Sequence, residues 1–155
     1  MGMFENIQNE NVRSLKLRDP VLAKPDDKVR DVVQAMRKLN LGCAIVVDDQ
    51  RKPTGMFTES MLTQMLVKDP AALQDAIGNH SADHWPQVST EDSVAAVLDA
   101  LEVKNVRFLS VVDERGRIAG LTGQKGLMEF IADHFPQVTV QPVGENLATT
   151  AREGA

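Results

Sequence analysis

The chain has 155 residues, 43% hydrophobic and 25% charged, which is ordinary for a soluble globular protein and excludes disordered, collagen-like and disulfide-rich classes. Its 17 Lys and Arg against 22 Asp and Glu give a net charge of −5, and only 4% of its residues are aromatic. Nucleic-acid binding needs clustered positive charge and stacking rings, so we expect no nucleic-acid partner.

The sequence also bears on the compartment of the protein. No stretch reaches the roughly 18 apolar residues that a membrane span needs, so we expect no membrane association. The opening residues MGMFENIQNE lack the basic and apolar regions of a signal peptide. Cys43 is the single cysteine and cannot form an internal disulfide. These features predict a cytoplasmic protein.

The first predicted elements are a short strand over 21–24 and the helix that follows it. Pro25 separates the two, because the residue before proline disfavours helix. Asp26 and Asp27 are expected to cap the helix, and Gly42 to end it with a positive φ. The helix is indicated by apolar residues at i, i+3, i+4 and i+7 spacing: Val29, Val32, Val33, Met36 and Leu39.

A β-hairpin and a second helix are predicted next. The continuous apolar run over 43–47 is typical of a strand buried on both faces. Residues 48–53 read as a turn and 54–57 as a second strand. Thr58 is then expected to cap a helix that ends near Lys68.

The connector that follows is predicted to hold one short helix. Asp69 and Pro70 form a good N-cap and N1 pair, so we expect a helix over 70–77 that ends at Gly78. His80 and His84 lie four residues apart, a spacing that could ligate a metal on a helix. Because the surrounding segment is polar and lacks other ligands, we expect a solvated loop and no metal site.

The remaining elements repeat the first set in the same order. A strand over 86–89 precedes a helix capped by Thr90, and Gly116 suits a hairpin turn. An edge strand over 138–143 and a fraying tail over 144–155 are expected at the end. The second unit is completed by a strand over 108–112, a turn over 113–116, a strand over 117–122 and a helix over 124–134.

The chain is an internal repeat. Shifted by 65 residues, it matches itself without a gap, and ten identities fall within residues 25–62, where chance gives roughly two or three. Two of them are Asn40 with Asn105 and Gly55 with Gly120. We therefore expect a mixed α+β fold of two β-α-β-β-α repeats related by pseudo-two-fold symmetry. The division is an N-terminal extension (1–12), repeat 1 (13–68), a connector (69–80), repeat 2 (81–136) and a C-terminal tail (137–155).

The strings VVDDQRKPTGMFTESML and VVDERGRIAGLTGQKGL resemble the CBS domain signature, in which a strand ending in Val-Val-Asp precedes a turn and Gly-aliphatic-x-Thr. Two such units resemble a tandem CBS pair, or Bateman module. The resemblance implies two three-stranded sheets packed together with four helices outside. It also implies clefts for adenine nucleotides or other adenosyl compounds, a sensing role and a homodimer formed through outer helices.

The resemblance implies a ribose-binding pair at the start of each last helix. Nucleotide-binding members carry Thr or Ser there, with Asp three residues later, to hold the ribose hydroxyls. Here Thr58 is followed by Met61, and the second repeat has Gly123 and Gly126. Neither repeat carries the complete pair, and Thr58 could equally be a plain N-cap.

Other positions follow from the same resemblance. Arg107 lies where members place a basic residue near the ligand phosphate; the alternative is a solvated arginine at the end of a strand. Phe108 and Leu109 fall where the adenine packs, or belong to the core. Their counterparts in the first repeat are Cys43 and Ala44, with Cys43 expected to be a buried inert thiol.

The segment GLTGQKG over 120–126 has three glycines at the start of a helix. Thr122, Gly123 and Lys125 could form a phosphate or carboxylate cradle there, or only a tight turn. The opening segments of the repeats line clefts in this family and add two further candidates: Lys24 for a phosphate and Ser89 for a base or ribose edge.

The sequence supports two functions. In the first, AMP, ADP, ATP or S-adenosylmethionine binds as a regulatory ligand, no cofactor being required, and changes a dimer or partner contact. In the second, the clefts are degenerate and the fold is a ligand-free dimer or interaction module for an unidentified protein partner. An enzyme is not expected, because catalytic motifs such as GxSxG, HExxH and CxxC are missing from the sequence.

Overall fold

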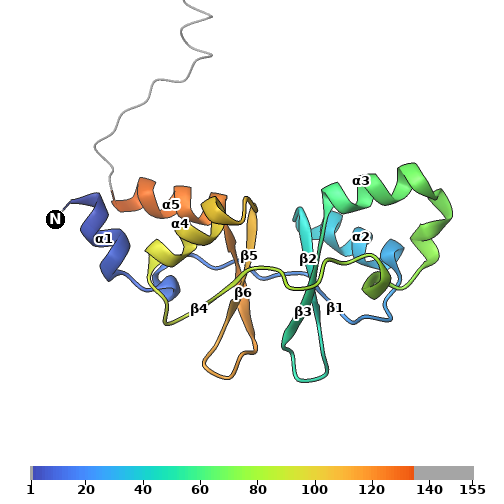
Figure 1. Cartoon of the computed structure of the whole chain (residues 1–155), viewed down its shortest axis with the longest axis horizontal. Helices are drawn as coiled ribbons and strands as arrows, with labels where there is room; N and C mark the ends of the chain where they lie inside the picture. The colour runs from blue at the N-terminus through green and yellow to red at the C-terminus, as the bar shows by residue number, and fades with distance from the viewer. Residues whose placement is uncertain (1, 135–155) are drawn as a thin grey trace, which may run out of the picture.

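Two three-stranded sheets lie at the centre of the molecule (Figure 1). The structure is a computed structural model that describes residues 2–134; the strand predicted over 138–143 and the tail over 144–155 lie outside the described residues. In each sheet the first strand runs parallel to the second, and the second pairs antiparallel with the third. The strands are β1 (Leu22–Ala23), β2 (Cys43–Val47), β3 (Pro53–Thr58), β4 (Gln87–Ser89), β5 (Phe108–Val112) and β6 (Ile118–Gly123).

Helices cover the outer side of each sheet (Figure 1). On the first sheet they are α2 (Val29–Leu39) and α3 (Glu59–Lys68). On the second they are α4 (Val94–Val103) and α5 (Gln124–His134), joined by α1 (Met3–Asn9), which packs against α4. The predicted mixed α+β fold and its repeated β-α-β-β-α order are confirmed.

Two predicted helix caps are wrong. α2 begins after Lys28 rather than after Asp26 and Asp27, because the Asp27 carboxylate instead accepts the N–H of Lys24 at 2.9 Å and closes the preceding turn. α4 begins after Ser93 rather than after Thr90, and the Ser93 hydroxyl accepts the N–H of Ala96 at 3.3 Å. In both repeats the cap therefore lies closer to the apolar stripe than predicted. By contrast, Thr58 does cap α3.

Left-handed backbone falls at equivalent positions of the two repeats. The residue that ends α2 is Asn40, with φ 53°, and not Gly42 as predicted. Asn105, 65 residues later, has φ 50°. Asparagine tolerates this conformation better than most residues, which explains one of the identities in the repeat. The predicted hairpin glycine, Gly116, does have a positive φ of 79°.

The connector holds two short 3₁₀-helices in place of the single helix predicted over 70–77. They are η2 (Pro70–Gln74), capped by Asp69 as expected, and η3 (Ile77–Asn79). Asp75 between them is extended, because its carbonyl accepts the N–H of Val29 at 3.0 Å. The tertiary contact therefore interrupts the helix.

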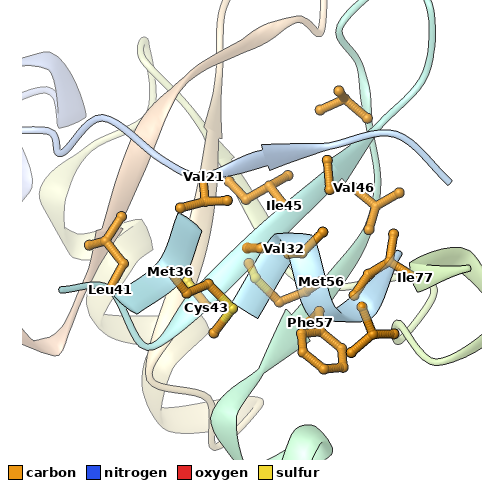
Figure 2. Packing of buried hydrophobic residues seen from close by; sticks show 14 of the residues in the cluster. Val21, Val32, Met36, Leu41, Cys43, Ile45, Val46, Met56, Phe57 and Ile77 are labelled. Carbon is orange, nitrogen blue, oxygen red and sulfur yellow. The ribbon is translucent and has the colours of Figure 1, made fainter. Parts of the chain in front are cut away.

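The segment that precedes each repeat packs on the other repeat. Val12 is fully buried with residues of the second repeat, and its N–H donates to the Asp92 carbonyl at 2.8 Å. Ile77, 65 residues later, is buried in the first repeat and donates its N–H to the Asp27 carbonyl. Figure 2 shows Ile77 in the same core as Phe57. The sequence did not predict this exchange of segments.

The core of the first repeat also includes residues of the second sheet. All of β2 is buried, as the apolar run predicted. Ile118 and Leu121 of β6 belong to the cluster that surrounds Ile45 and Phe57 of the first sheet. Residues of both sheets are therefore removed from water together, which is a strong stabilising term and fixes how the repeats face each other.

Candidate functional site

Two clefts lie where α3 and α5 begin, close to the starts of β2 and β5. The first, here called the indole cleft, has a volume of about 320 Å³ and is lined among others by Gly42, Thr58, Met61, Trp85, Arg107 and Phe108. The second, here called the basic cleft, has a volume of about 30 Å³ and is lined among others by Lys16, Arg18, Arg107, Thr122, Lys125 and Gly126. The repeat relates the two clefts, because Thr58 and Met61 correspond to Gly123 and Gly126.

The indole cleft has an aromatic wall that is held in place. The Trp85 indole N–H donates to the Phe108 carbonyl at 2.8 Å. The Phe108 ring reaches across to the first repeat, where a Cβ on Gly42 would lie 3.0 Å from its Cζ. Indole and phenyl faces at the edge of a cavity of this size suit a flat apolar group.

The start of α3 borders the indole cleft, and a backbone N–H of its first turn already has a side-chain hydrogen-bond partner. The Thr58 hydroxyl accepts the N–H of Met61 at 3.3 Å, so it acts as the helix cap. Glu59 follows directly and adds a carboxylate to the cleft lining. Met61 contributes a flexible, polarisable side chain where a ribose-binding carboxylate would have been expected.

The basic cleft concentrates positive charge in an acidic chain. Lys16, Arg18, Arg107 and Lys125 line it with a single carboxylate, Glu129. Within residues 2–134, the ion pairs include Lys16 with Asp133 at 3.7 Å, whereas the other three cations have no carboxylate within 4.0 Å. A cluster of this kind attracts anions even when the net charge of the protein is negative.

The first turn of α5 lies against the basic cleft without a side-chain cap. Gly123 precedes the helix, and a Cβ there would overlap the carbonyl oxygen of Arg107. The Thr122 hydroxyl is buried and has no hydrogen-bond partner among the described residues. A Cβ on Gly126 would lie 2.6 Å from that hydroxyl oxygen. The glycine spacing therefore brings strand, helix and hydroxyl into close approach.

The structure brings together six of the residues that the sequence singled out. Arg107 and Phe108 line both clefts. Arg107 stacks over the Phe108 ring, with its Cζ 5.9 Å from the ring centroid. The other four divide between the clefts: Thr58 in the indole cleft, and Thr122, Gly123 and Lys125 in the basic cleft.

The other five candidates lie away from both clefts. Leu109, Cys43 and Ala44 are buried in the core. Lys24 is exposed in the turn before α2, and the Ser89 hydroxyl accepts a backbone N–H in the turn before α4. None of these five side chains contributes to the lining of either cleft, so a ligand role for them stays a prediction.

The Cys43 thiol is a poor nucleophile. Burial raises the pKa of its thiol to about 12, and the charge of Glu59 adds to the rise while Arg18 opposes it. A thiol with so high a pKa has almost no nucleophilic thiolate at neutral pH.

The lining residues that were missed from the sequence include Trp85, Lys16 and Arg18. Trp85 is the only tryptophan and lies in a polar segment just before β4, which is a usable signal for an aromatic ligand contact. Lys16 and Arg18 carried no such signal. They reach the second repeat because Arg18, in the stretch that follows Val12, pairs with Leu121 of β6.

Residues 2–134 hold no group of three or more His, Cys, Asp or Glu side chains arranged around a metal position. His80 instead lies 2.8 Å from the Asp75 carboxylate, within the connector. In the same residues no helix has both the length and the apolar character for a membrane span.

Comparisons with known proteins place this geometry in a family. The CBS domain profile matches residues 12–68 and 83–133. An uncharacterized protein of Methanopyrus kandleri, MK0525, is 21% identical over 126 residues, or 79% of this chain. The match spans 63% of that relative's length.

Solved structures share the fold at low sequence identity. The CBS domain pair of MJ0100, in complex with 5′-methylthioadenosine and S-adenosyl-L-methionine, has a TM-score of 0.71 and 16% identity, with 80% of this chain and 97% of that chain covered. CBSX2 in complex with AMP has a TM-score of 0.71 and 15% identity, with 81% and 98% covered. With its two matched segments in tandem, the chain belongs to the CBS domain family as a CBS domain pair.

Proposed function

We propose that the protein is a regulatory module, not an enzyme, and that it binds an adenosyl compound in the clefts between its two repeats. The nucleoside would occupy the indole cleft, and binding would shift the packing of the repeats and alter a dimer or partner contact. The observation that carries the proposal is the aromatic wall of Trp85 and Phe108, held by a 2.8 Å hydrogen bond at the edge of a cavity of about 320 Å³.

Two kinds of evidence support this assignment. Proteins of the same fold have been solved with AMP, 5′-methylthioadenosine and S-adenosyl-L-methionine, which all contain adenine joined to a ribose-derived sugar. In this chain, the cleft that offers aromatic faces also adjoins Arg18, Arg107 and Lys125, which have no carboxylate partner among residues 2–134. An apolar pocket with a few convergent polar groups is the usual form of a small-molecule site.

Thermal unfolding with a ligand panel tests the proposal. The panel contains AMP, ADP, ATP, S-adenosylmethionine, 5′-methylthioadenosine and adenosine. A ligand at a hundredfold its Kd stabilises the folded state by about 2.7 kcal/mol. At about 2–4 °C per kcal/mol for a domain of this size, the midpoint should rise by roughly 5–11 °C.

The location of binding can be read from the single tryptophan. A ligand in the indole cleft should change the fluorescence of Trp85 and lose affinity in Trp85→Ala. A matched control is Phe130→Leu, a core substitution on the buried side of α5 that touches neither cleft. Light scattering with and without ligand then shows whether binding changes the dimeric state. If no compound of the panel raises the unfolding midpoint of a ligand-free preparation, the proposal is refuted.

A second function, a ligand-free interaction module, is favoured by a different observation. Apolar side chains are exposed on the outer helices, with Val103 of α4 76% exposed and Met128 of α5 69% exposed. Exposed apolar groups of this kind can serve a homodimer or an unidentified protein partner. Dimerisation that is lost in Met128→Lys and indifferent to every adenosyl compound would favour this function.

A further inference from the structure

We propose that the two clefts are halves of one ligand site, with the nucleoside in the indole cleft and its phosphate in the basic cleft at the start of α5. The inference rests on the proposed function and specifies the class and orientation of the ligand: a nucleoside phosphate, bound once per chain. Two repeats would by themselves suggest two equivalent ligand sites. Because the two clefts differ in size and charge, we infer a single ligand site that uses both.

The clefts differ in size. The indole cleft has about 320 Å³, whereas the basic cleft has about 30 Å³. The smaller volume corresponds to roughly two water molecules. It is therefore suited to one small polar group and too small for a nucleoside.

The clefts also differ in charge at the helix that borders each one. At α3, Thr58 caps the first turn and Glu59 brings a carboxylate, so an anion would be repelled. At α5, an 11-residue helix, the cap position is Gly123 and the equivalent first turn carries Lys125. Exposed N–H groups and the helix dipole favour an anion at such an end.

The buried hydroxyl of Thr122 is an independent sign of a missing partner. Thr122 is 4% exposed, and its hydroxyl is the only buried side-chain polar group without a hydrogen bond in residues 2–134. It points at Gly126, in the first turn of α5. An unpaired buried hydroxyl is unfavourable, so a phosphate oxygen that accepted its hydrogen bond would remove a cost already present in the free protein.

Arg107 and Phe108 are common to the two clefts, because both residues line both of them. A nucleoside against the Phe108 ring would therefore place its phosphate beside Arg107. The guanidinium is held over the Phe108 ring and has no carboxylate partner among the described residues. Arginine in that state is well suited to a bidentate contact with phosphate.

Calorimetric titration of the full chain tests the inference with AMP, adenosine and inorganic phosphate as probes. We expect one AMP per chain, adenosine bound at least tenfold more weakly, and competition of excess phosphate with AMP but not with adenosine. Two AMP molecules per chain would overturn the single site.

Two variants test the basic cleft. Lys125→Ala and Thr122→Val should each weaken AMP about tenfold, the loss of one charge-assisted hydrogen bond, with a much smaller effect on adenosine. Lys104→Ala, which changes net charge equally at an exposed position outside both clefts, is the matched control. Thr122→Val should also raise the melting temperature of the free protein, which shows that it folds.

The outcomes separate the two proposals. If both variants weaken AMP and adenosine equally, or leave AMP unchanged, the phosphate is not in the basic cleft and this inference fails while the proposed function stands. If neither AMP nor adenosine nor any other adenosyl compound binds, the proposed function fails and this inference with it.

Discussion

Substitution of Gly123 by alanine should destabilise the protein through a backbone clash. The new Cβ would overlap the Arg107 carbonyl oxygen and lie 3.3 Å from Cα of Phe108, so β5 and β6 would have to separate locally. Overpacking costs about 1–3 kcal/mol, and the hydrogen bond from Gln124 N–H to Arg107 would add about 1 kcal/mol when lost. We expect a total loss of about 2–4 kcal/mol in the free energy of unfolding.

Thermal unfolding followed by circular dichroism and Trp85 fluorescence measures this effect. The midpoint should fall by roughly 4–16 °C, at about 2–4 °C per kcal/mol. Gly123→Ser separates the clash from the helix cap, because serine is a better cap than alanine by about 1 kcal/mol but carries the same Cβ. Thr58→Ala, at the equivalent position of the first repeat, should lose only its cap, about 1 kcal/mol.

The reasoning would be refuted if Gly123→Ala and Gly123→Ser were both as stable as the native protein. A serine variant more stable than the native protein would mean that α5 lacks only a cap and that the strands leave room for a side chain. That result would also remove the physical reason why the second repeat has glycine where the first has threonine.

Three further predictions follow from burial and backbone conformation. Because burial raises the pKa of Cys43, the thiol ionises more readily in the unfolded chain than in the folded state. The free energy of unfolding should therefore fall above pH 9 by about 1.4 kcal/mol per pH unit, up to about pH 12. Denaturant titrations at several pH values should show a shallower fall in Cys43→Ala. Ile77→Ala should cost about 2–5 kcal/mol in denaturant unfolding, whereas Ala76→Gly nearby should cost far less. Asn40→Gly should keep or raise the melting temperature and Asn40→Val should lower it, because φ is 53° there; equal melting temperatures would contradict this.

Local patterns predicted most of the elements correctly. The apolar run over 43–47 is a fully buried strand, and the helix predicted over 124–134 is α5 with the same bounds. Their signals are periodicity and continuous hydrophobicity, which act within one element. Caps were less well predicted: Asp27 and Ser93 are both good capping residues, and only the turn geometry decides which side chain faces a helix end.

The candidate site was predicted in part. Arg107, Phe108, Thr122 and Lys125 were expected to lie near a ligand and do line the clefts. Leu109 was expected there too, but it is fully buried. Side chains alternate between the two faces of a strand, so neighbours such as Phe108 and Leu109 point in opposite directions.

The sequence alone determined that the protein is a duplicated mixed α+β unit, because a shift of 65 residues aligns both apolar periods and turn residues. Only the tertiary structure decided how the clefts differ. Lys16 and Arg18, at the start of the first repeat, reach the second repeat where Arg18 pairs with Leu121, and Trp85, just before β4, reaches Phe108. These contacts link residues far apart in the chain. They arise because Ile118 and Leu121 of the second sheet are buried in the core of the first repeat, which no local pattern encodes.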